Sequence, residues 1–390
     1  MPSTTSLPDN IERCRQRVAS LLECLRLSRP LTGADRMALF LGSRTNGGRA
    51  LPDYFLVYFL LVDLLEFPNF GQDEKVAWSV PVQYEGRLYV VEHRKMGLGI
   101  FEPQLDPTKR MSGPVTEQGE RDSVEICKLI QKACDLAEPY FEWRAQLQAK
   151  GSELNVVNHS RWLFERYEFF RSEAYRAASE SEARREQKDY TGAWHASKQA
   201  DWFAQSAIEA FFSWTEHAFI HLAILQGKLT TGEEVRVVAA ADWRAKFKAA
   251  IDVSESAAKA HYDRLLDLRT QIRNFLAHGS FGKRGEAFSF HSGAGAVPLL
   301  ISEGANHPFH IAGRPATQDF LALSQIQEFI DWLWATHLAT AKLHLDSSLP
   351  SILTYAVNGT YASAMQDEDS MREFVEHLER KWDDAANMDW

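Results

Sequence analysis

The stretch "HASKQADWFAQSAIEAFFSWTEHAFIHLAILQGK", residues 195–228, predicts a long and very apolar helix that begins near residue 191. Gly227 is expected to end this helix, because glycine is favoured just past a helix C-terminus. The chain contains 11 Trp, 11 Tyr and 23 Phe residues, and such an aromatic content favours thick helical cores. The stretch therefore indicates a mainly α fold.

Further helices are expected to follow it along the chain, at residues 241–253, 255–278 and 317–346. Residues 280–316 interrupt them, because "EAFSFHSGAGAVPLLISE" predicts a β-hairpin and "HPFHIAG" a further strand. We therefore expect a helical bundle over residues 191–348 with a β-like insertion at 280–316.

The N-terminal part, residues 1–121, is expected to be a smaller α+β region. Residues 75–101 alternate like strands around a Glu85-Gly86 turn, and Pro81 limits the first strand to a sheet edge. The sequence of residues 102–121 predicts a loop. The other expected segments are helical: residues 10–28 and 53–67, a connector at 122–190, and a C-terminal tail at 349–390.

The composition is that of an ordinary globular protein, with 45% apolar and 25% charged residues. A net charge of −10 argues against a protein that coats nucleic acid, although it permits a local basic site. The N-terminus lacks the apolar run of a signal peptide, and residues 54–67 are too short to span a bilayer. The cysteines Cys127 and Cys134 are seven residues apart and are expected to be small buried hydrophobes. We expect a cytoplasmic protein without a membrane segment.

The segment "RTQIRNFLAHGS", residues 269–280, forms the end of the helix expected at 255–278, which Ser254 is expected to cap. At about 100° per residue, Asn274 and His278 fall roughly opposite the core face, and Arg273 lies between. The core face is expected to consist of Leu265, Leu268, Ile272, Phe275 and Leu276. The polar residues therefore face solvent or a partner.

This helix end is suited to chemistry on a phosphodiester. The exposed carbonyls at a helix C-terminus favour a cation, so His278 should hold a proton more readily than a free imidazole. An imidazole can move protons while the Arg273 guanidinium neutralises phosphate charge. The plainer alternative is that Arg273 and His278 only cap the last carbonyls.

Arg273-Asn274-Phe275-Leu276-Ala277-His278 resembles the Rx4–6H motif of the HEPN superfamily (higher eukaryotes and prokaryotes nucleotide-binding). Members often have a polar residue after the arginine, as Asn274 is here. The family fold is a helical bundle with the motif near the end of a late helix, and the resemblance covers roughly residues 191–346. Residues 1–190 are not covered.

The resemblance implies a metal-independent endoribonuclease without a cofactor, of a kind often found among toxins and defence effectors. The ribose 2′-OH would attack the adjacent phosphate, His278 would transfer the proton, Arg273 would stabilise the phosphorane, and Asn274 would position the phosphate or the histidine. It also implies RNA as the substrate, a homodimer with a site built across two protomers, and a possible regulatory or antitoxin protein.

Other residues are expected to support this site. Between Lys259 and Arg284 there are six Lys or Arg residues and two acids, and Arg269, Lys283 and Arg284 are expected to bind the RNA. A polar stripe on the apolar helix contains Ser206, Glu209, Ser213 and Glu216 or His217. Glu209 would pair with Arg273 or Arg269 across the bundle, or the stripe would simply face water or a dimer mate.

Three alternatives compete with this interpretation. The first is a non-catalytic HEPN module that binds a nucleotide or a partner protein. The second is a metal site at His217 and His221, which are four residues apart on one helix, although such a pair is more often packing. The third is a metal-dependent nuclease that uses Glu92 and Lys95 at a strand end, with Asp73 as the upstream acid.

Overall fold

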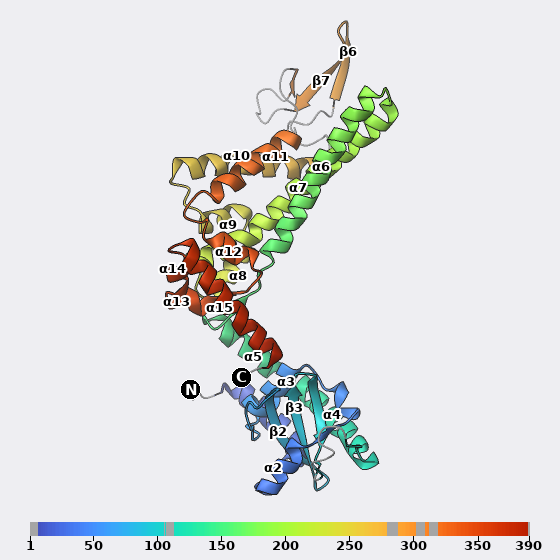
Figure 1. Ribbon diagram of the computed structural model, residues 1–390, viewed down its shortest axis with the longest axis vertical. Coiled ribbons are helices and arrows are strands. Elements are labelled where there is room, and N and C mark those ends of the chain that lie inside the picture. The colour runs from blue at the N-terminus through green and yellow to red at the C-terminus, as the bar shows by residue number, and fades with distance from the viewer. Residues whose placement is uncertain are drawn as a thin grey trace. The chain divides into compact units, whose positions relative to one another are not determined.

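The computed structural model divides into two compact units, Met1–Gln148 with Leu378–Trp390, and Ala149–His377 (Figure 1). The chain is mainly helical, as expected, with small antiparallel sheets. The structure describes residues 7–104, 106, 113–278, 288–301, 309–311 and 319–388, without the side chains at 271–278, 298, 300, 301 and 310.

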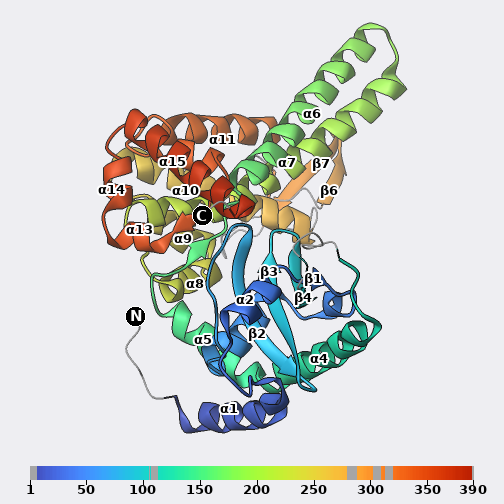
Figure 2. The ribbon, with the colours of Figure 1, turned by 60° about the horizontal axis from the view of Figure 1, so that its bottom comes forward.

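The first unit contains a four-stranded antiparallel sheet in the order β1-β4-β3-β2 (Figure 2). The expected turn at Glu85-Gly86 joins β2 to β3, with φ angles of 49° and 77°. Pro81 lies on the edge strand β2, as expected, where a missing N–H costs no ladder hydrogen bond. The strands are β1 (Ser43–Arg44), β2 (Val76–Tyr84), β3 (Arg87–Arg94) and β4 (Gly97–Glu102).

Helices pack on both faces of this sheet because neighbouring strand residues point to opposite faces. Val91 and Ile100 join the main core with α1 and α4, whereas Val90 and Phe101 pack against Leu39 of α2. Cys127 and Cys134 lie buried in the main core, as expected. The helices are α1 (Asp9–Leu22), η1 (Glu23–Leu25), α2 (Gly33–Phe40), η2 (Gly47–Ala50), α3 (Tyr54–Tyr58), the π-helix η3 (Phe59–Leu64), α4 (Glu117–Leu136) and α5 (Glu138–Ala149).

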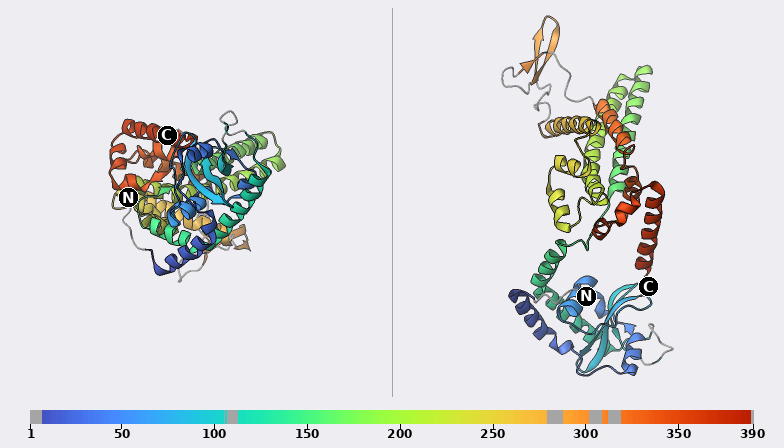
Figure 3. Two further views of the ribbon diagram at one scale, coloured as in Figure 1. Left: turned by 90° about the horizontal axis from the view of Figure 1, so that it is seen from below. Right: turned by 90° about the vertical axis from the view of Figure 1, so that its left-hand side faces the viewer.

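The second unit is built on a long helical hairpin, α6 (Ser160–Glu186) and α7 (Tyr190–Leu225), which runs beyond α9 and α10 (Figure 3). Small side chains such as Ala174 and Ala177 on α6 and Ala200 and Ala204 on α7 are buried, which lets the two helices approach closely. Gly227, at a φ of 69°, follows the end of α7 as expected. The expected connector at 122–190 is thus divided, with α4 and α5 in the first unit and α6 in the second.

The C-terminal part of α7 is covered by aromatic side chains from α9, α10 and α11. Phe211, Phe219, Trp243, Phe247 and Phe329 form the centre of this core and are almost fully buried. The remaining elements of the unit are α8 (Gly232–Ala240), α9 (Trp243–Ala250), α10 (Ser256–His278), α11 (Asp319–Leu333), α12 (Ala341–Asp346), α13 (Leu353–Val357) and α14 (Thr360–Ala364), the two-stranded sheet β5 (Asn155–Val156) with β9 (Ser351–Ile352), and α15 (Glu368–Asn387), which continues past the division.

The expected β-like insertion is a three-stranded antiparallel sheet in its described part. β6 (Phe288–Ser292) and β7 (Gly295–Ile301) form the hairpin, and β8 (Phe309–His310) pairs with β7. Gly295, with a φ of 98°, begins β7 directly after the turn. The alternating pattern of the sequence therefore identified this segment correctly.

Three expected boundaries were wrong. The expected helix 317–346 is broken between α11 and α12, because the Thr336 hydroxyl donates to the Leu333 carbonyl and accepts the Leu338 N–H. α10 begins at Ser256, two residues after the expected cap Ser254, whose N–H donates to Asp252. α4 begins inside the loop expected at 102–121, at a Thr116 cap that accepts the Gly119 N–H.

Candidate functional site

The Arg273–His278 motif occupies the C-terminal end of α10, a helix of 23 residues. The side chains of residues 271–278 and all of residues 279–287 lie outside the part of the chain that the structure describes. This applies to the expected catalytic residues Arg273, Asn274 and His278 and to the expected RNA-binding residues Lys283 and Arg284.

The helices α10 and α11 run in opposite directions where their described side chains meet. The His261 ring stacks on Trp332 with ring centres 4.8 Å apart. Arg264, about one turn after His261 on α10, donates to Glu328 at 2.6 Å. Glu328 lies about one turn before Trp332 on α11. These contacts hold the N-terminal half of α10 against the C-terminal half of α11, and the motif follows further along α10.

Arg269, the last described basic residue before the motif, is held by a carboxylate of α7. Its Nη2 donates to Glu216 Oε1 at 2.7 Å, and Lys246 Nζ of α9 donates to Glu216 Oε2 at 2.8 Å. The Lys246 side chain is only 8% exposed, so Glu216 is the counter-ion of an almost buried ammonium group. The cluster joins α7, α9 and α10 and has one more positive than negative charge.

Glu209 does not pair with Arg269, because the carboxylate that binds Arg269 is Glu216. Glu209 and Ser213 are exposed on α7, and the Ser206 hydroxyl donates to the Trp202 carbonyl. The sequence pattern had included Glu216 in the same polar stripe. It could not distinguish the two carboxylates, because the partners come from two other helices.

The two α7 histidines, His217 and His221, belong to a buried hydrogen-bonded chain. Their Nε2 atoms lie 3.0 Å apart, and His217 Nε2 accepts the His159 N–H at 2.8 Å. His217 Nε2 therefore carries no proton, and His221 must donate through its own Nε2. The chain continues from His221 Nδ1 to the Ser351 hydroxyl at 2.8 Å, and from there to His344 Nε2 at 3.2 Å.

These imidazoles are neutral because burial disfavours their charged forms. Burial lowers the pKa of His217 and of His344 to about 4, and lowers the pKa of His221 well below its usual value. Each neutral imidazole then donates from one nitrogen and accepts at the other along this series of hydrogen bonds. The series ends at His344 Nδ1, which is buried without a hydrogen bond. These hydrogen bonds join α7, α12 and β9, which is the role of packing residues rather than of metal ligands.

Glu92 and Lys95, the third alternative site, are engaged separately. Glu92 is 5% exposed, and its carboxylate accepts bonds from the Ser79 hydroxyl at 2.7 Å and from Arg94 Nε at 2.6 Å. Lys95 Nζ donates to the Asn387 side chain at 2.9 Å. Within the described ranges, no group of three or more His, Cys, Asp or Glu side chains could hold a metal ion.

Each unit contains a cavity. In the second unit, a cavity of about 470 Å³ lies between α6, α7 and α11, with Tyr175, Asp201 and Phe320 among its lining residues. In the first unit, a groove of about 510 Å³ lies between α3, η3 and α5, with apolar walls that include Phe55, Phe59 and Phe141.

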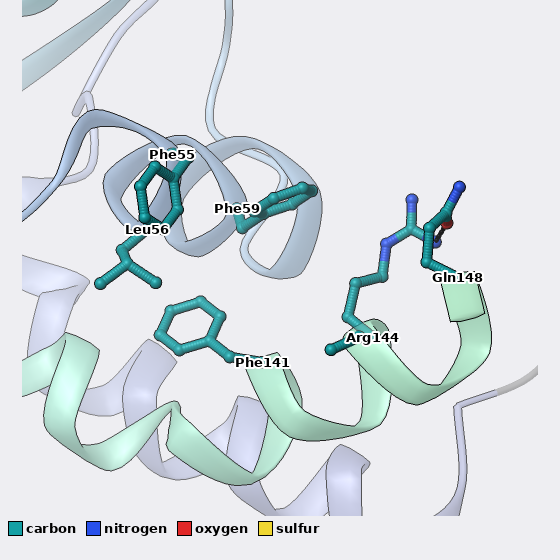
Figure 4. A pocket seen from close by; sticks show the side chains of 7 residues that line it. Phe55, Leu56, Phe59, Phe141, Arg144 and Gln148 are labelled. Carbon is teal, nitrogen blue, oxygen red and sulfur yellow. Dashed lines mark hydrogen bonds between the residues drawn. The ribbon is translucent and has the colours of Figure 1, made fainter. Parts of the chain in front are cut away.

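Figure 4 shows the groove of the first unit, with the side chains of Arg144 and Gln148 at one end. Arg144 Nε donates to Asp63 at 3.2 Å, and Arg144 Nη1 donates to Gln148 at 3.3 Å. The only charged lining residue is thus already paired with a carboxylate. The groove can bury an apolar group and offers no unpaired charge in its lining.

The chain matches no protein-family model, and no curated protein or solved structure is significantly similar to it. Among the helices that the structure describes, none has the length and apolar character needed to cross a membrane.

Proposed function

We propose that the chain is a metal-independent endoribonuclease of the HEPN type, with its site at the end of α10. The 2′ oxygen forms a bond to phosphorus while the bond to the 5′ oxygen breaks, which yields a 2′,3′-cyclic phosphate. A proton leaves the 2′ hydroxyl and one is delivered to the 5′ oxygen, and His278 carries out proton transfer. Arg273 stabilises the charge on the phosphorane oxygens, and Asn274 positions the phosphate or the imidazole.

One observation carries this proposal, the position of the Arg273–His278 motif in the last turns of a helix that packs in a bundle with α11. The carbonyl end of a helix stabilises a nearby cation, which favours a protonated imidazole at position 278. Arg269 precedes Arg273 by one helical turn and is fixed by Glu216 at 2.7 Å. An anchored turn next to the motif is the kind of support that a reacting group needs.

The test is incubation of the purified chain with a mixed RNA pool in the presence of EDTA. Cleavage should occur, should leave 2′,3′-cyclic ends, and should fail on substrates with a 2′-deoxy ribose at the scissile position. The variant His278→Ala should lose about 10²–10⁴-fold in rate, which is the usual contribution of general acid–base help.

Two results would change the conclusion. RNA or nucleotide binding without turnover by the unaltered chain would make it a non-catalytic binding module. Cleavage that EDTA abolishes and that His278→Ala retains would move the chemistry to a metal site, and Glu92 with Lys95 would be the first residues to replace.

A further inference from the structure

The cavity between α6, α7 and α11 combines two aromatic side chains with charged groups that have no partner among the described residues. Tyr175 of α6 and Phe320 of α11 meet edge to face with ring centres 5.4 Å apart. The cavity volume of about 470 Å³ lies within the range of roughly 300–1,000 Å³ that is typical of ligand sites. The walls are therefore suited to a planar ligand of about the size of a nucleoside.

The lining residues Asp201, Glu182 and Arg185 make no side-chain hydrogen bond or ion pair with any residue that the structure describes. Other charged residues of the same hairpin are paired: Arg184 binds both Glu180 and Asp189. The carboxylate and guanidinium groups that line the cavity are thus unpaired among the described residues, whereas the nearby charged groups of the hairpin form ion pairs with one another. Such an arrangement offers both acceptors and donors to a ligand.

A second carboxylate, Asp319, precedes Phe320 on α11 and lies just outside the lining of the cavity. Gln205 donates to one oxygen of Asp319 at 3.1 Å, while the other oxygen, Oδ1, is buried without a hydrogen bond. Burial raises the pKa of Asp319, and the nearby Asp201 raises it further. Burial also raises the pKa of Asp201. Asp201 thus lies near a second carboxylate but is itself exposed, so its oxygens are accessible to a ligand with N–H donors.

We propose that this cavity binds a guanine base. The ring stacks against Tyr175, the Asp201 carboxylate accepts the N1–H and N2–H donors, and Arg185 donates to O6 or N7. Among the bases, only guanine presents two adjacent N–H donors on its Watson–Crick edge and two acceptors on its major-groove edge. Splayed bases of single-stranded RNA are commonly recognised by this combination of stacking and edge hydrogen bonds.

The cavity and the proposed site belong to the same unit of the structure. Phe320 is the second residue of α11, and α11 packs against α10, the helix that ends in the motif. A base held there can belong to the RNA strand that is cleaved, and this step rests on the proposed ribonuclease function. A free guanine nucleotide presents the same chemistry, and its binding does not depend on that function.

The first test is calorimetric titration of the full chain with GMP, IMP and AMP. GMP should bind most tightly, IMP, which lacks the N2 amine, more weakly, and AMP more weakly still. Asp201→Asn should weaken GMP binding by roughly tenfold or more, because an amide cannot accept both donors. Arg185→Gln should also weaken it. The matched control Glu168→Gln, an exposed carboxylate on α6 outside the cavity, should bind GMP normally.

The second test separates RNA from free nucleotide. The non-cleaving variant His278→Ala is titrated with a short single-stranded RNA that contains one G, and with the same RNA carrying I or A at that position. A preference for the G-containing strand that Asp201→Asn removes supports an RNA subsite. A preference seen only with free GMP assigns the cavity to a nucleotide and overturns the RNA assignment.

The base assignment is overturned if GMP and AMP bind equally, or if Asp201→Asn has no effect on GMP. Binding of spermidine or arginine without any nucleotide would make the cavity a cation site instead. If the chain cleaves no RNA but still selects GMP, the ribonuclease function fails and the guanine site stands. If cleavage is real but no guanine is selected, the opposite holds.

Discussion

Arg269 of α10 donates a hydrogen bond to Glu216 of α7 at 2.7 Å, and the other oxygen of the same carboxylate binds Lys246 of α9. One carboxylate therefore ties three helices together one turn before the Arg273–His278 motif. Because the Lys246 side chain is only 8% exposed, the carboxylate also neutralises an almost buried charge. The geometry of the motif helix depends on this contact.

The first prediction concerns Glu216→Gln. The substitution keeps the size of the side chain and leaves Lys246 without a counter-ion, so the free energy of unfolding should fall by about 1–3 kcal/mol. It should also slow RNA cleavage, because the turn before the motif loses an anchor. Urea denaturation and a cleavage assay measure the two effects. An unchanged free energy of unfolding would mean that the ion pair contributes nothing net to stability.

The variant Glu209→Gln tests the alternative carboxylate on the same helix. Glu209 is exposed, so its replacement should change the free energy of unfolding by no more than about 0.5 kcal/mol. A loss as large as that of Glu216→Gln would show that Glu209 has a structural partner after all.

The second prediction is a loss of stability on acidification that arises from the hydrogen-bonded histidines. Burial lowers the pKa of His217 and His344 to about 4 in the folded state, below the ordinary value of 6.5. Between these pH values the unfolded chain therefore binds more protons than the folded chain. The contribution of the histidines to the free energy of unfolding is full above about pH 6.5 and falls as the pH drops toward 4. Each group contributes a slope of up to about 1.4 kcal/mol per pH unit in this window.

Urea denaturation at pH 7.5, 6.0 and 5.0 measures this slope. His344→Phe removes one titrating group and an unpaired buried nitrogen, so it should reduce the dependence on pH even if it changes the stability at pH 7.5. An identical slope in the variant and the unaltered chain would assign the acid sensitivity to other groups.

The helices and hairpins could be predicted from the sequence where the local spacing of apolar residues determines the secondary structure. The apolar helix of α7, its end at Gly227, the β2–β3 hairpin and the β6–β7 hairpin all follow from spacing and turn residues. The break after α11 could not be predicted in this way, because the Thr336 hydroxyl competes for backbone groups in a segment with a helical pattern.

The site could be predicted less completely, because its contacts join residues that are distant in the sequence. Glu209 and Glu216 lie on one polar stripe, and only the approach of Lys246 and Arg269 selects Glu216. The cavity at Asp201 is lined in part by Phe320, more than a hundred residues further along the chain. Periodicity predicts which face of a helix a residue occupies, whereas the partner of that face depends on the tertiary fold.

The third prediction is that the chain forms a homodimer through the bundle, as the proposed HEPN-type site requires. Asn274 and His278 fall away from the core face of their own helix by sequence spacing, so a second protomer can complete the site. Light scattering should give about twice the chain mass of 44.3 kDa. A strictly monomeric protein that still cleaves RNA would contradict a site shared between protomers.

The fourth prediction concerns the insertion, which begins directly after His278. Replacing residues 280–316 with a short Gly-Ser linker should change the RNA preference or the rate of cleavage, because the segment contains Lys283, Arg284 and three histidines. Circular dichroism should show the helical fold unchanged. If the same RNAs are cleaved at the same rate, the insertion has no part in substrate access.

The last prediction separates the two roles proposed for Arg273, a point charge and a planar donor. Arg273→Lys keeps the positive charge but loses the fork of N–H donors that fits two phosphate oxygens. If the guanidinium stabilises the phosphorane, the lysine variant should cleave RNA nearly as poorly as Arg273→Ala, with a lower kcat and a KM close to that of the unaltered chain. If it only attracts the RNA, the lysine variant should keep most of its kcat, and Arg273→Ala should mainly raise KM. Single-turnover cleavage at several RNA concentrations distinguishes these outcomes, and an unimpaired kcat in Arg273→Ala would remove Arg273 from the proposed chemistry.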